Sequence, residues 1–563
     1  MVKPFPTLIH KFIGVQRGSH MKRRKYLPIF YSIVIILIIF SFHTCQNLKH
    51  ITSSPSDKWA RELYIDKSPY KKTVSMEMNE EDIVILTAKE DRFSKTVLEK
   101  DKARIKETED IIIPDAALNK LVKYQSMEPY IFWTENYELY ASKSINGNTY
   151  EEKSLILDKV KDFEALSHED NIYLAVADET GLRYYMIDDK GVHQFGETYA
   201  FEEPVCVSAA IDDAGILHTV SIREISPMEK EIIYLNFLKG EWSLKAQKVE
   251  NFQISNESIG NLEIGLDNDY AYIFYENNVW NKAGQTAKTQ YAAVPLNEAY
   301  VSEMGFKPFK PLGRESQTDV YISEVRCPDK KQDELMAVFI ENHHDETGSG
   351  FRILNAYFRD GIISNQLYST KTLDFIKGIN IVKHGEDEAL VFLRAAGEFK
   401  YDVFFTEIGE EYAAIMEKPT KQDYFIAMAN SISPFINGFI IAIIKAFVFI
   451  PAILWLVFVE VFEIKKFVRN PKLNYSMAIG LFMIIKLITA NSYYTGLSYY
   501  MIPNFMQPPF IKYMIMVCIS VISYLMAKAW KKSIEYLHVI PEFLLFMLYD
   551  LLITVFLYGP YIT

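Results

Sequence analysis

Apolar residues are concentrated in one run near the start of the chain, Leu27 to Phe42, and in four runs near its end. Each of the later runs is close to the ~20 residues that cross a hydrocarbon core of ~30 Å. They are Pro434 to Ile464, Tyr475 to Asn491, Phe510 to Lys528 and Ile540 to Tyr558. A long polar stretch lies between the first run and these four. This pattern predicts a membrane protein with a large domain on one side of the bilayer.

Basic residues flank these runs in alternation. The cluster Lys22 to Lys25 precedes the first run, and further basic residues occupy 465–472 and 528–532, whereas 493–509 carries no charge. Because loops rich in Lys and Arg stay in the cytoplasm, the alternation predicts a multi-pass protein of the cell membrane. The large domain is then extracytoplasmic.

The first run is typical of an uncleaved signal anchor, because it follows a basic segment and no small-x-small cleavage site comes after it. Cleavage of this span, and the choice between Met1 and Met21 as the true start, are left open by the sequence. His43-Thr44-Cys45 is a poor lipidation motif. The predicted segments are a basic cytoplasmic N-terminus (1–26), a transmembrane signal anchor (27–43), a linker with candidate ring-closing strands (44–117), a β-propeller (118–410), a second linker (411–433) and a four-helix transmembrane region (434–563).

The polar stretch repeats a strand-turn-strand unit with a strongly apolar strand at its centre. The mean spacing is about 52 residues, and units of 40 to 55 residues with three or four strands are typical of β-propeller blades. The six central strands begin at Tyr130, Ile172, Ile216, Tyr270, Leu335 and Ala389. The predicted fold is therefore an all-β extracytoplasmic β-propeller of six blades plus an α-helical transmembrane bundle. Seven blades are the alternative, because Asp82 to Lys100 contains another strand pair that would complete a blade or close the ring.

One turn carries a family resemblance. Ser144-Ile-Asn146-Gly147-Asn-Thr149-Tyr150 resembles the Asp-box of sialidase-like and BNR-type propellers, Ser-x-Asp-x-Gly-x-Thr-Trp, shortened by one residue and with Asn for Asp and Tyr for Trp. The resemblance implies a propeller fold over about half of the chain. In that family the box is a structural turn on the outer edge of a blade and has no catalytic role.

Charge and cysteine content narrow the partners. Residues 44–433 hold 43 basic and 67 acidic residues, a net charge of −24, against −12 for the whole chain. An acidic surface repels phosphate backbones, so nucleic acid is not an expected partner. The cysteines, Cys45, Cys206, Cys327 and Cys518, have no spacing that indicates zinc. A bridge between Cys206 and Cys327 is compatible with the pattern but not implied by it.

Conventional catalytic motifs are absent from the sequence. It contains no Gly-rich phosphate loop, GxSxG elbow or HExxH motif. A sialidase-like site would need converging arginines, and no spacing marks a triad among Arg183, Arg223, Arg326, Arg352 and Arg394. His343-His344-Asp345-Glu346 offers metal-ligand types, but adjacent side chains in a loop before Gly348 diverge. We therefore predict no catalytic residue, no metal and no cofactor.

Two charged residues lie deep within predicted spans. Counted at 1.5 Å per residue from the inner boundaries, Lys486 lies roughly 21 Å deep and Asp550 roughly 14 Å deep. A lysine side chain covers that difference if the two spans are neighbours, so the residues are a candidate intramembrane pair. Such a pair either fixes helix register or belongs to an ion or proton path. The structural role is the favoured interpretation.

Three functions remain in order of preference. The first is a non-enzymatic membrane protein whose propeller binds or senses a ligand, or acts as a scaffold, with an envelope glycan, peptide or protein as the partner besides the lipid bilayer. The second is a transporter or transport-complex component that uses Lys486 and Asp550. The third is a sialidase-like surface hydrolase.

Overall fold

The computed structural model describes residues 20–70, 72–169, 171–188, 191–226, 228–251, 257–281, 284–313, 321–345, 348–371, 374–397, 400–490, 503–506, 508–533 and 538–558. It contains two compact units. The strand unit lies within Ser53–His344 and Ser349–Lys418, and the helical unit lies mainly within Met1–Thr52 and Pro419–Thr563.

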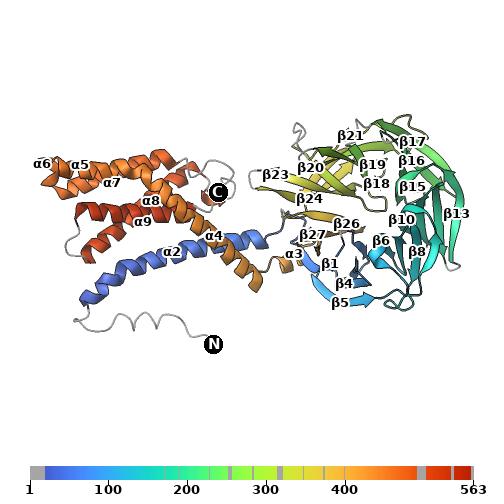
Figure 1. Ribbon diagram of the computed structural model, residues 1–563, viewed down its shortest axis with the longest axis horizontal. Coiled ribbons are helices and arrows are strands. Elements are labelled where there is room, and N and C mark those ends of the chain that lie inside the picture. Colours follow the sequence, from blue (N-terminus) through green and yellow to red (C-terminus); the bar gives the residue numbers. More distant parts are fainter. Residues whose placement is uncertain are drawn as a thin grey trace. The chain divides into compact units, whose positions relative to one another are not determined.

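The strand unit is a β-propeller of seven four-stranded blades (Figure 1). In each blade the strands are antiparallel, and in six blades they follow one another in chain order from the centre outwards. Blade 1 comprises β2 (Ser75–Met78), β3 (Asp82–Ala88), β4 (Phe93–Glu99) and β5 (Arg104–Ile111). Blade 2 comprises β6 (Leu121–Met127), β7 (Tyr130–Glu135), β8 (Glu138–Lys143) and β9 (Ser154–Leu157). Blade 3 comprises β10 (Val160–His168), β11 (Asn171–Asp178), β12 (Gly181–Asp188) and β13 (Gly191–Ala200). Blade 4 comprises β14 (Pro204–Ile211), β15 (Leu217–Ser226), β16 (Glu229–Leu238) and β17 (Glu241–Asn251). Blade 5 comprises β18 (Glu257–Leu266), β19 (Tyr270–Asn281), β20 (Gly284–Pro295) and β21 (Lys307–Pro308). Blade 6 comprises β22 (Tyr321–Arg326), β23 (Leu335–Asp345), β24 (Gly348–Arg359) and β25 (Ile362–Tyr368).

The seventh blade closes the ring with strands from both ends of the unit. It combines β26 (Ile376–His384), β27 (Asp387–Ala395) and β28 (Tyr401–Glu407) with β1 (Leu63–Ser68) as its outermost strand. In the β1–β28 pair, Leu63 lies opposite Phe405. The first strands β2, β6, β10, β14, β18, β22 and β26 each contact the next, and β26 contacts β2. The ring is therefore continuous, which removes the exposed edge that an open sheet would leave.

The first expectation of six blades is wrong, and the alternative of seven is confirmed. The segment Asp82 to Lys100, set apart from the six repeats, contains β3 and β4, the two middle strands of a complete blade. The second strand of this blade begins at Asp82, 48 residues before the second strand of the next blade, which begins at Tyr130. This spacing is within the range of the other repeats. This blade was missed because its first strand, β2, has only four residues.

The second strand of each blade is strongly apolar because both of its faces are buried between neighbouring blades. On β19, Ile273 packs in the core shared with blade 4, whereas Tyr272 and Phe274 pack in the core shared with blade 6. On β7, Phe132 faces blade 3 and Trp133 faces blade 1. Alternating side chains thus enter two different cores, and both sets must be apolar.

The helical unit is built from apolar helices. It comprises α2 (His20–Thr52), α4 (Lys421–Ala446), η2 (Phe447–Phe449), α5 (Ile450–Val461), α6 (Lys465–Val468), α7 (Pro471–Ile488), η5 (Asn504–Met506), α8 (Pro509–Ser533) and α9 (Val539–Tyr558). Four helices of the described chain are long and apolar enough to cross a membrane, namely α2 over Pro28–Thr52, α7, α8 over Phe510–Lys532 and α9. The run predicted as a further span, 434–464, is divided among α4, η2 and α5, and α5 alone is shorter than a span.

Helix α2 is an integral part of this helical unit. Its Ile39 is buried in a core with residues of α8 and α9. His43 Nε2 lies 3.0 Å from the carbonyl oxygen of Phe556 on α9. Asn47 Nδ2 donates to Ser431 Oγ of α4 at 2.8 Å. The N-terminal helix therefore packs with the C-terminal helices through both apolar and polar contacts.

Candidate functional site

The first strands of the seven blades enclose a cavity of about 400 Å³ at the centre of the propeller. All seven first strands contribute lining residues. Seven of these residues are charged: Lys72, Lys123, Asp162, Glu164, Glu263, Arg326 and Asp329. The volume is within the range of small-molecule sites, and the lining is unusually polar for one.

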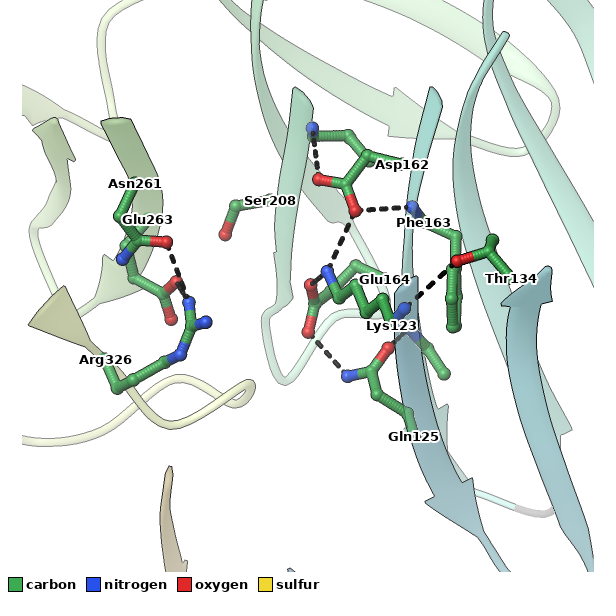
Figure 2. A network of polar contacts seen from close by, with 12 residues as sticks. Lys123, Gln125, Thr134, Asp162, Phe163, Glu164, Ser208, Asn261, Glu263 and Arg326 are labelled. Atoms are coloured by element: carbon green, nitrogen blue, oxygen red, sulfur yellow. Dashed lines mark hydrogen bonds and ion pairs between the residues drawn. The ribbon is translucent and has the colours of Figure 1, made fainter. Parts of the chain in front are cut away.

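One wall of the cavity carries a cluster centred on Lys123 of β6 (Figure 2). Lys123 Nζ lies 2.8 Å from Glu164 Oε2 and 3.2 Å from Asp162 Oδ1, both carried by β10. Gln125, two residues along β6, donates from Nε2 to Glu164 Oε1 at 2.6 Å. The cation and its two carboxylates therefore join two neighbouring blades.

A second cluster, centred on Arg326, faces the first across the cavity (Figure 2). Arg326 Nη1 of β22 donates to Glu263 Oε2 at 2.8 Å and to Asn261 Oδ1 at 3.2 Å, both on β18. The other oxygen of Glu263 accepts from the amide of Cys327 at 3.0 Å. This cluster joins blades 5 and 6.

Burial and pairing shift the ionisation of these groups. Burial raises the pKa of Glu263 to about 7, although Arg326 acts in the opposite direction. Burial would lower the pKa of Lys123, but Asp162 and Glu164 outweigh it, so the pKa of this lysine is raised. Against the effect of burial, the neighbouring carboxylates also raise the pKa of Arg326, so both cations stay charged at neutral pH, whereas burial opposes the ionisation of Glu263.

Side chains of the first strands also connect every neighbouring pair of blades around the ring. Each link joins one side chain to a main-chain group of the adjacent first strand or of the residue before it. The seven links are Ser126 N to Ser75 Oγ (2.8 Å), Ala165 N to Gln125 Oε1 (2.8 Å), Val207 N to Asp162 Oδ2 (3.1 Å), Ile264 N to Ser208 Oγ (3.2 Å), Asn261 Nδ2 to Val325 O (2.7 Å), Gly378 N to Glu324 Oε2 (2.5 Å) and Asn380 Nδ2 to Val74 O (3.0 Å). The ring of links satisfies main-chain groups that an inner edge strand would leave unpaired.

Apart from Arg326, Cys206 and Cys327, which the sequence analysis considered for other roles, the cavity residues were not identified from the sequence, although a signal was present. On several of the strands that precede a strongly apolar strand, polar residues occur two apart, as in Lys123 and Gln125, Asp162 and Glu164, and Asn261 and Glu263. Residues two apart on a strand share a face. Once the blades are aligned, these pairs mark the face that lines the centre.

The five arginines considered for a sialidase-like site do not gather in the cavity. Arg326 lines it, whereas the other four lie on second or third strands. Arg183, Arg223 and Arg394 pair with Asp178, Glu231 and Asp374 at 2.8, 2.7 and 3.6 Å, and the Arg352 guanidinium lies 5.7 Å from the centre of the Tyr368 ring. The centre is lined by the first strands and the residues directly beside them, so arginines farther out in a blade cannot join Arg326 there.

The remaining candidates for redox or metal chemistry are placed as follows. Cys206 and Cys327 both line the cavity and both are free thiols. Burial raises the pKa of the Cys206 thiol to about 12. The side chains of His343 to Glu346 lie outside the described residues. Within the described residues there is no group of three His, Cys, Asp or Glu side chains with metal-binding geometry.

The Asp-box-like segment forms a turn between β8 and β9, the two outer strands of blade 2. Gly147 N donates to Ser144 Oγ at 2.7 Å, and Thr149 N donates to Asn146 Oδ1 at 2.9 Å. Ser144 and Tyr150 form an antiparallel bridge across it. The Ser144 and Asn146 side chains are thus engaged with the main chain of the turn itself.

The two charged residues of the helical unit lie side by side. Lys486 Nζ of α7 is 2.6 Å from Asp550 Oδ1 of α9, and each residue is 1% exposed. The ammonium also donates to Ser520 Oγ at 3.1 Å and to the Met516 carbonyl oxygen at 3.2 Å, both on α8. Ser520 Oγ donates in turn to Asp550 Oδ2. One lysine therefore connects three helices.

Comparisons with known proteins assign neither a family nor an activity to this chain. No family model and no curated protein matches the sequence. Similar solved structures include a chain from the S. cerevisiae complex of Dbp5 with Nup159 and Gle1 (10% identity, 63% of this chain and 98% of that chain, TM-score 0.33). Others are the GH93 α-L-arabinofuranosidase of Fusarium graminearum (9%, 42% and 74%, 0.28) and the polysaccharide lyase Uly1 (10%, 60% and 90%, 0.28). Both enzymes have propeller-type folds. At these values the likeness carries no argument about the activity of this chain.

Proposed function

We propose that this chain is a non-enzymatic, membrane-tethered binding protein whose propeller takes up a ligand in its central cavity, as a sensor or as a scaffold of the cell envelope. The observation that carries the proposal is the cavity itself: a preformed, polar space enclosed by all seven blades. Rigid blades hold its charged side chains in place before a ligand arrives, and a preorganised site binds with less loss of conformational entropy.

The chemistry of the cavity favours binding over catalysis. Among its described lining residues, Lys123 and Arg326 are already paired with carboxylates, and no histidine is present. The Cys206 thiol, with its pKa raised to about 12, is a poor nucleophile at neutral pH. An activated nucleophile with an adjacent base therefore has no support among these residues. A sialidase-like hydrolase lacks support for the same reason, since its arginines do not converge.

Apolar helices precede and follow the propeller in the sequence, which supports a tether at its N-terminal and its C-terminal strand. β1 and β28 are neighbours in the seventh blade, so the connections from α2 and towards α4 leave the ring at one place. The basic segments 465–472 and 528–532 and the start of α2 lie at one end of the helical unit (Figure 1). Near the two basic segments, His538 Nδ1, just before α9, lies 3.2 Å from Glu460 Oε1 of α5. The positive-inside rule then favours a cytoplasmic position for that end and an extracytoplasmic propeller in the cell membrane.

A transport function receives less support from the Lys486–Asp550 pair. The three N–H groups of the ammonium have three acceptors, on Asp550, Ser520 and Met516. A group in an ion or proton path must exchange such partners during each cycle. A closed set of hydrogen bonds at 1% exposure instead favours a pair that fixes the register of three helices.

The partners we propose are the lipid bilayer and one envelope ligand, either a glycan, a peptide or a protein. Nucleic acid is disfavoured by the net charge of −24 over residues 44–433. The acidic surface also disfavours polyanionic glycans as ligands of the propeller.

The test is a binding screen on the full chain in lipid nanodiscs against envelope glycans, peptides and lipids, with product formation followed in the same wells. We expect saturable binding without product, weakened by Lys123→Met and unchanged by Lys120→Met, because Lys120 is an exposed residue outside the cavity. Product formation would overturn the non-enzymatic assignment. Binding that Lys123→Met leaves unchanged would place the ligand elsewhere on the protein.

A further inference from the structure

Two of the seven charged residues that line the cavity form no ion pair with a described residue. They are Lys72, just before β2, and Asp329, just after β22. The other five pair within the Lys123 and Arg326 clusters. Five of the seven charged lining residues are thus in ion pairs with one another, and one cation and one anion are left to pair with a ligand.

The two residues lie towards opposite ends of the cavity. All first strands run in the same direction around a propeller, so residues before β2 and residues after β22 are at opposite faces of the ring. Two links through β26 align the strands: Glu324 of β22 bonds Gly378, and Val74 bonds Asn380, two residues further along β26. Because each link runs through a side chain, Val74 is level with residue 326 of β22 to within a few residues, and Asp329 lies up to about five residue steps beyond the level of Lys72.

This offset sets the size of a ligand that reaches both residues. Five steps at ~3.3 Å give an axial separation of at most about 16 Å between the two Cα atoms. At that separation, the charges lie roughly 8 Å apart along the axis when the lysine side chain (about 6 Å) and the aspartate side chain (about 2 Å) extend towards each other, and up to about 16 Å apart when both extend across the cavity. The ends of an extended tripeptide or tetrapeptide are about 9 to 13 Å apart by the same geometry.

The surrounding charge distinguishes the two ends of the cavity. The described residues of the seven turns that follow the first strands include twelve acidic and two basic residues. The described residues of the seven connections that precede the first strands include five of each. Asp329 therefore lies at the acidic face, from which β28 also leads out of the ring, and Lys72 lies at the neutral face. A cationic group is favoured only at the Asp329 end.

The surroundings of Lys72 and Asp329 disfavour the charged form of each side chain. Burial lowers the pKa of Lys72. Burial raises the pKa of Asp329, and the nearby carboxylates of Glu164 and Glu77 add to this effect although Lys330 opposes it. Each charge lies in surroundings that disfavour it, so each gains from a ligand group of opposite sign.

We propose that the cavity binds a short peptide with free termini, about three or four residues long, with its carboxylate at Lys72 and its ammonium group at Asp329. The inference rests on the proposed binding function and adds to it the class of ligand and its direction. Binding occurs through the two ends of the peptide, so its side chains are secondary to its length and to its two charges.

Calorimetric titration of the full chain in nanodiscs with alanine peptides tests this inference. We expect Ala-Ala-Ala or Ala-Ala-Ala-Ala to bind best in a series from two to six residues. N-acetylation, which removes the ammonium charge, and C-terminal amidation, which removes the carboxylate charge, each weaken binding about tenfold or more, the effect of losing ~1.4 kcal/mol. Equal affinity of the capped and free peptides would overturn the inference.

Substitutions assign each end of the peptide to a residue. In Lys72→Met, amidation no longer weakens binding, whereas acetylation still does; in Asp329→Asn the pattern is reversed. Lys120→Met, on the same face as Lys72, and Asp333→Asn, on the same turn as Asp329, retain both effects. These comparisons use ratios between peptides, so a variant with fewer folded molecules still gives a readable answer. Exchange of the two patterns would overturn the proposed direction.

The two proposals fail in different ways. Suppose that another ligand binds saturably, that Lys123→Met weakens its binding, and that no peptide binds. The peptide inference is then wrong, while the binding function stands. If neither the peptides nor the screened ligands bind the folded chain, both are contradicted.

Discussion

Substitution of Glu407 by Gln tests the energetics of ring closure. Glu407 is the last residue of β28, the strand that pairs with β1, and it is 3% exposed. Its Oε1 accepts from the amide of Asp101, in the β4–β5 turn of blade 1, at 2.9 Å. Lys100 of the same turn pairs with Asp387 of β27 beside it. A glutamine at 407 keeps the acceptor oxygen for the Asp101 amide and removes the charge.

The magnitude follows from the ionisation of this carboxyl. Burial, reinforced by Asp101 and Asp387 and opposed by the Asp101 amide and Lys100, raises the pKa of Glu407 from 4.5 to about 8. The folded state therefore favours the protonated form. Glu407 contributes its full stability below pH 4.5 and loses it as the pH rises to about 8. At ~1.36 kcal/mol per unit, the total change is about 5 kcal/mol as an upper value.

Glutamine imitates the protonated carboxyl at every pH. The free energies of unfolding of the wild type and Glu407→Gln are then similar near pH 5, and the variant becomes more stable by about 1.4 kcal/mol for each further pH unit up to about 8. This difference is measured by urea unfolding of the full chain in detergent, in which hydrogen exchange of peptides from β1 and β28 reports the unfolding. Glu410→Gln, at an exposed site nearby, is the control. Parallel curves for wild type and Glu407→Gln between pH 5 and 8 would refute the reasoning.

Three further predictions concern other parts of the fold. Ser208→Ala removes the acceptor for a buried main-chain amide of the next blade and is expected to lower the free energy of unfolding by about 1–3 kcal/mol in the same urea assay. Asp550→Asn leaves Lys486 buried without its counter-ion, which is expected to cost about 3–5 kcal/mol and to lower the yield of folded protein. The double variant with Asp550→Leu and Lys486→Met is expected to restore the yield. A transport role predicts instead that Asp550→Asn has a normal yield and loses flux. Gly181→Ala places a Cβ 2.1 Å from a carbonyl oxygen and is expected to destabilise the propeller by more than about 3 kcal/mol, while Gly147→Ala, with open space around its Cβ, costs about 1 kcal/mol by calorimetry.

Strong local patterns made the fold class predictable. The second strand of each blade is buried on both faces, so it appears in the sequence as an apolar run such as Ile131 to Trp133, and its regular spacing indicated blades. The apolar runs of α2, α7, α8 and α9 were equally direct. The blade count was harder, because it depended on recognising that β3 and β4 belong to a repeat whose first strand is short.

The cavity could not be predicted in the same way, because it depends on closure of the ring. Lys123 and Glu164 are 41 residues apart, and Arg326 and Glu263 are 63 residues apart, so no local motif connects them. Each appears in the sequence as an ordinary polar position on a half-exposed strand. The depth argument placed Lys486 near Asp550 because helix geometry is regular, but the contribution of Ser520 and Met516 depends on the packing of α8.

The position of the propeller relative to the membrane is the central claim, and selective labelling in intact cells tests it most directly. In a full chain without its four native cysteines, Tyr137→Cys places a thiol at an exposed propeller turn (65% exposed), and Val468→Cys places one on α6 (52% exposed). A membrane-impermeant maleimide is predicted to label the first variant in intact cells and the second only after permeabilisation. Labelling of the α6 thiol in intact cells, with the propeller thiol protected, would contradict the account.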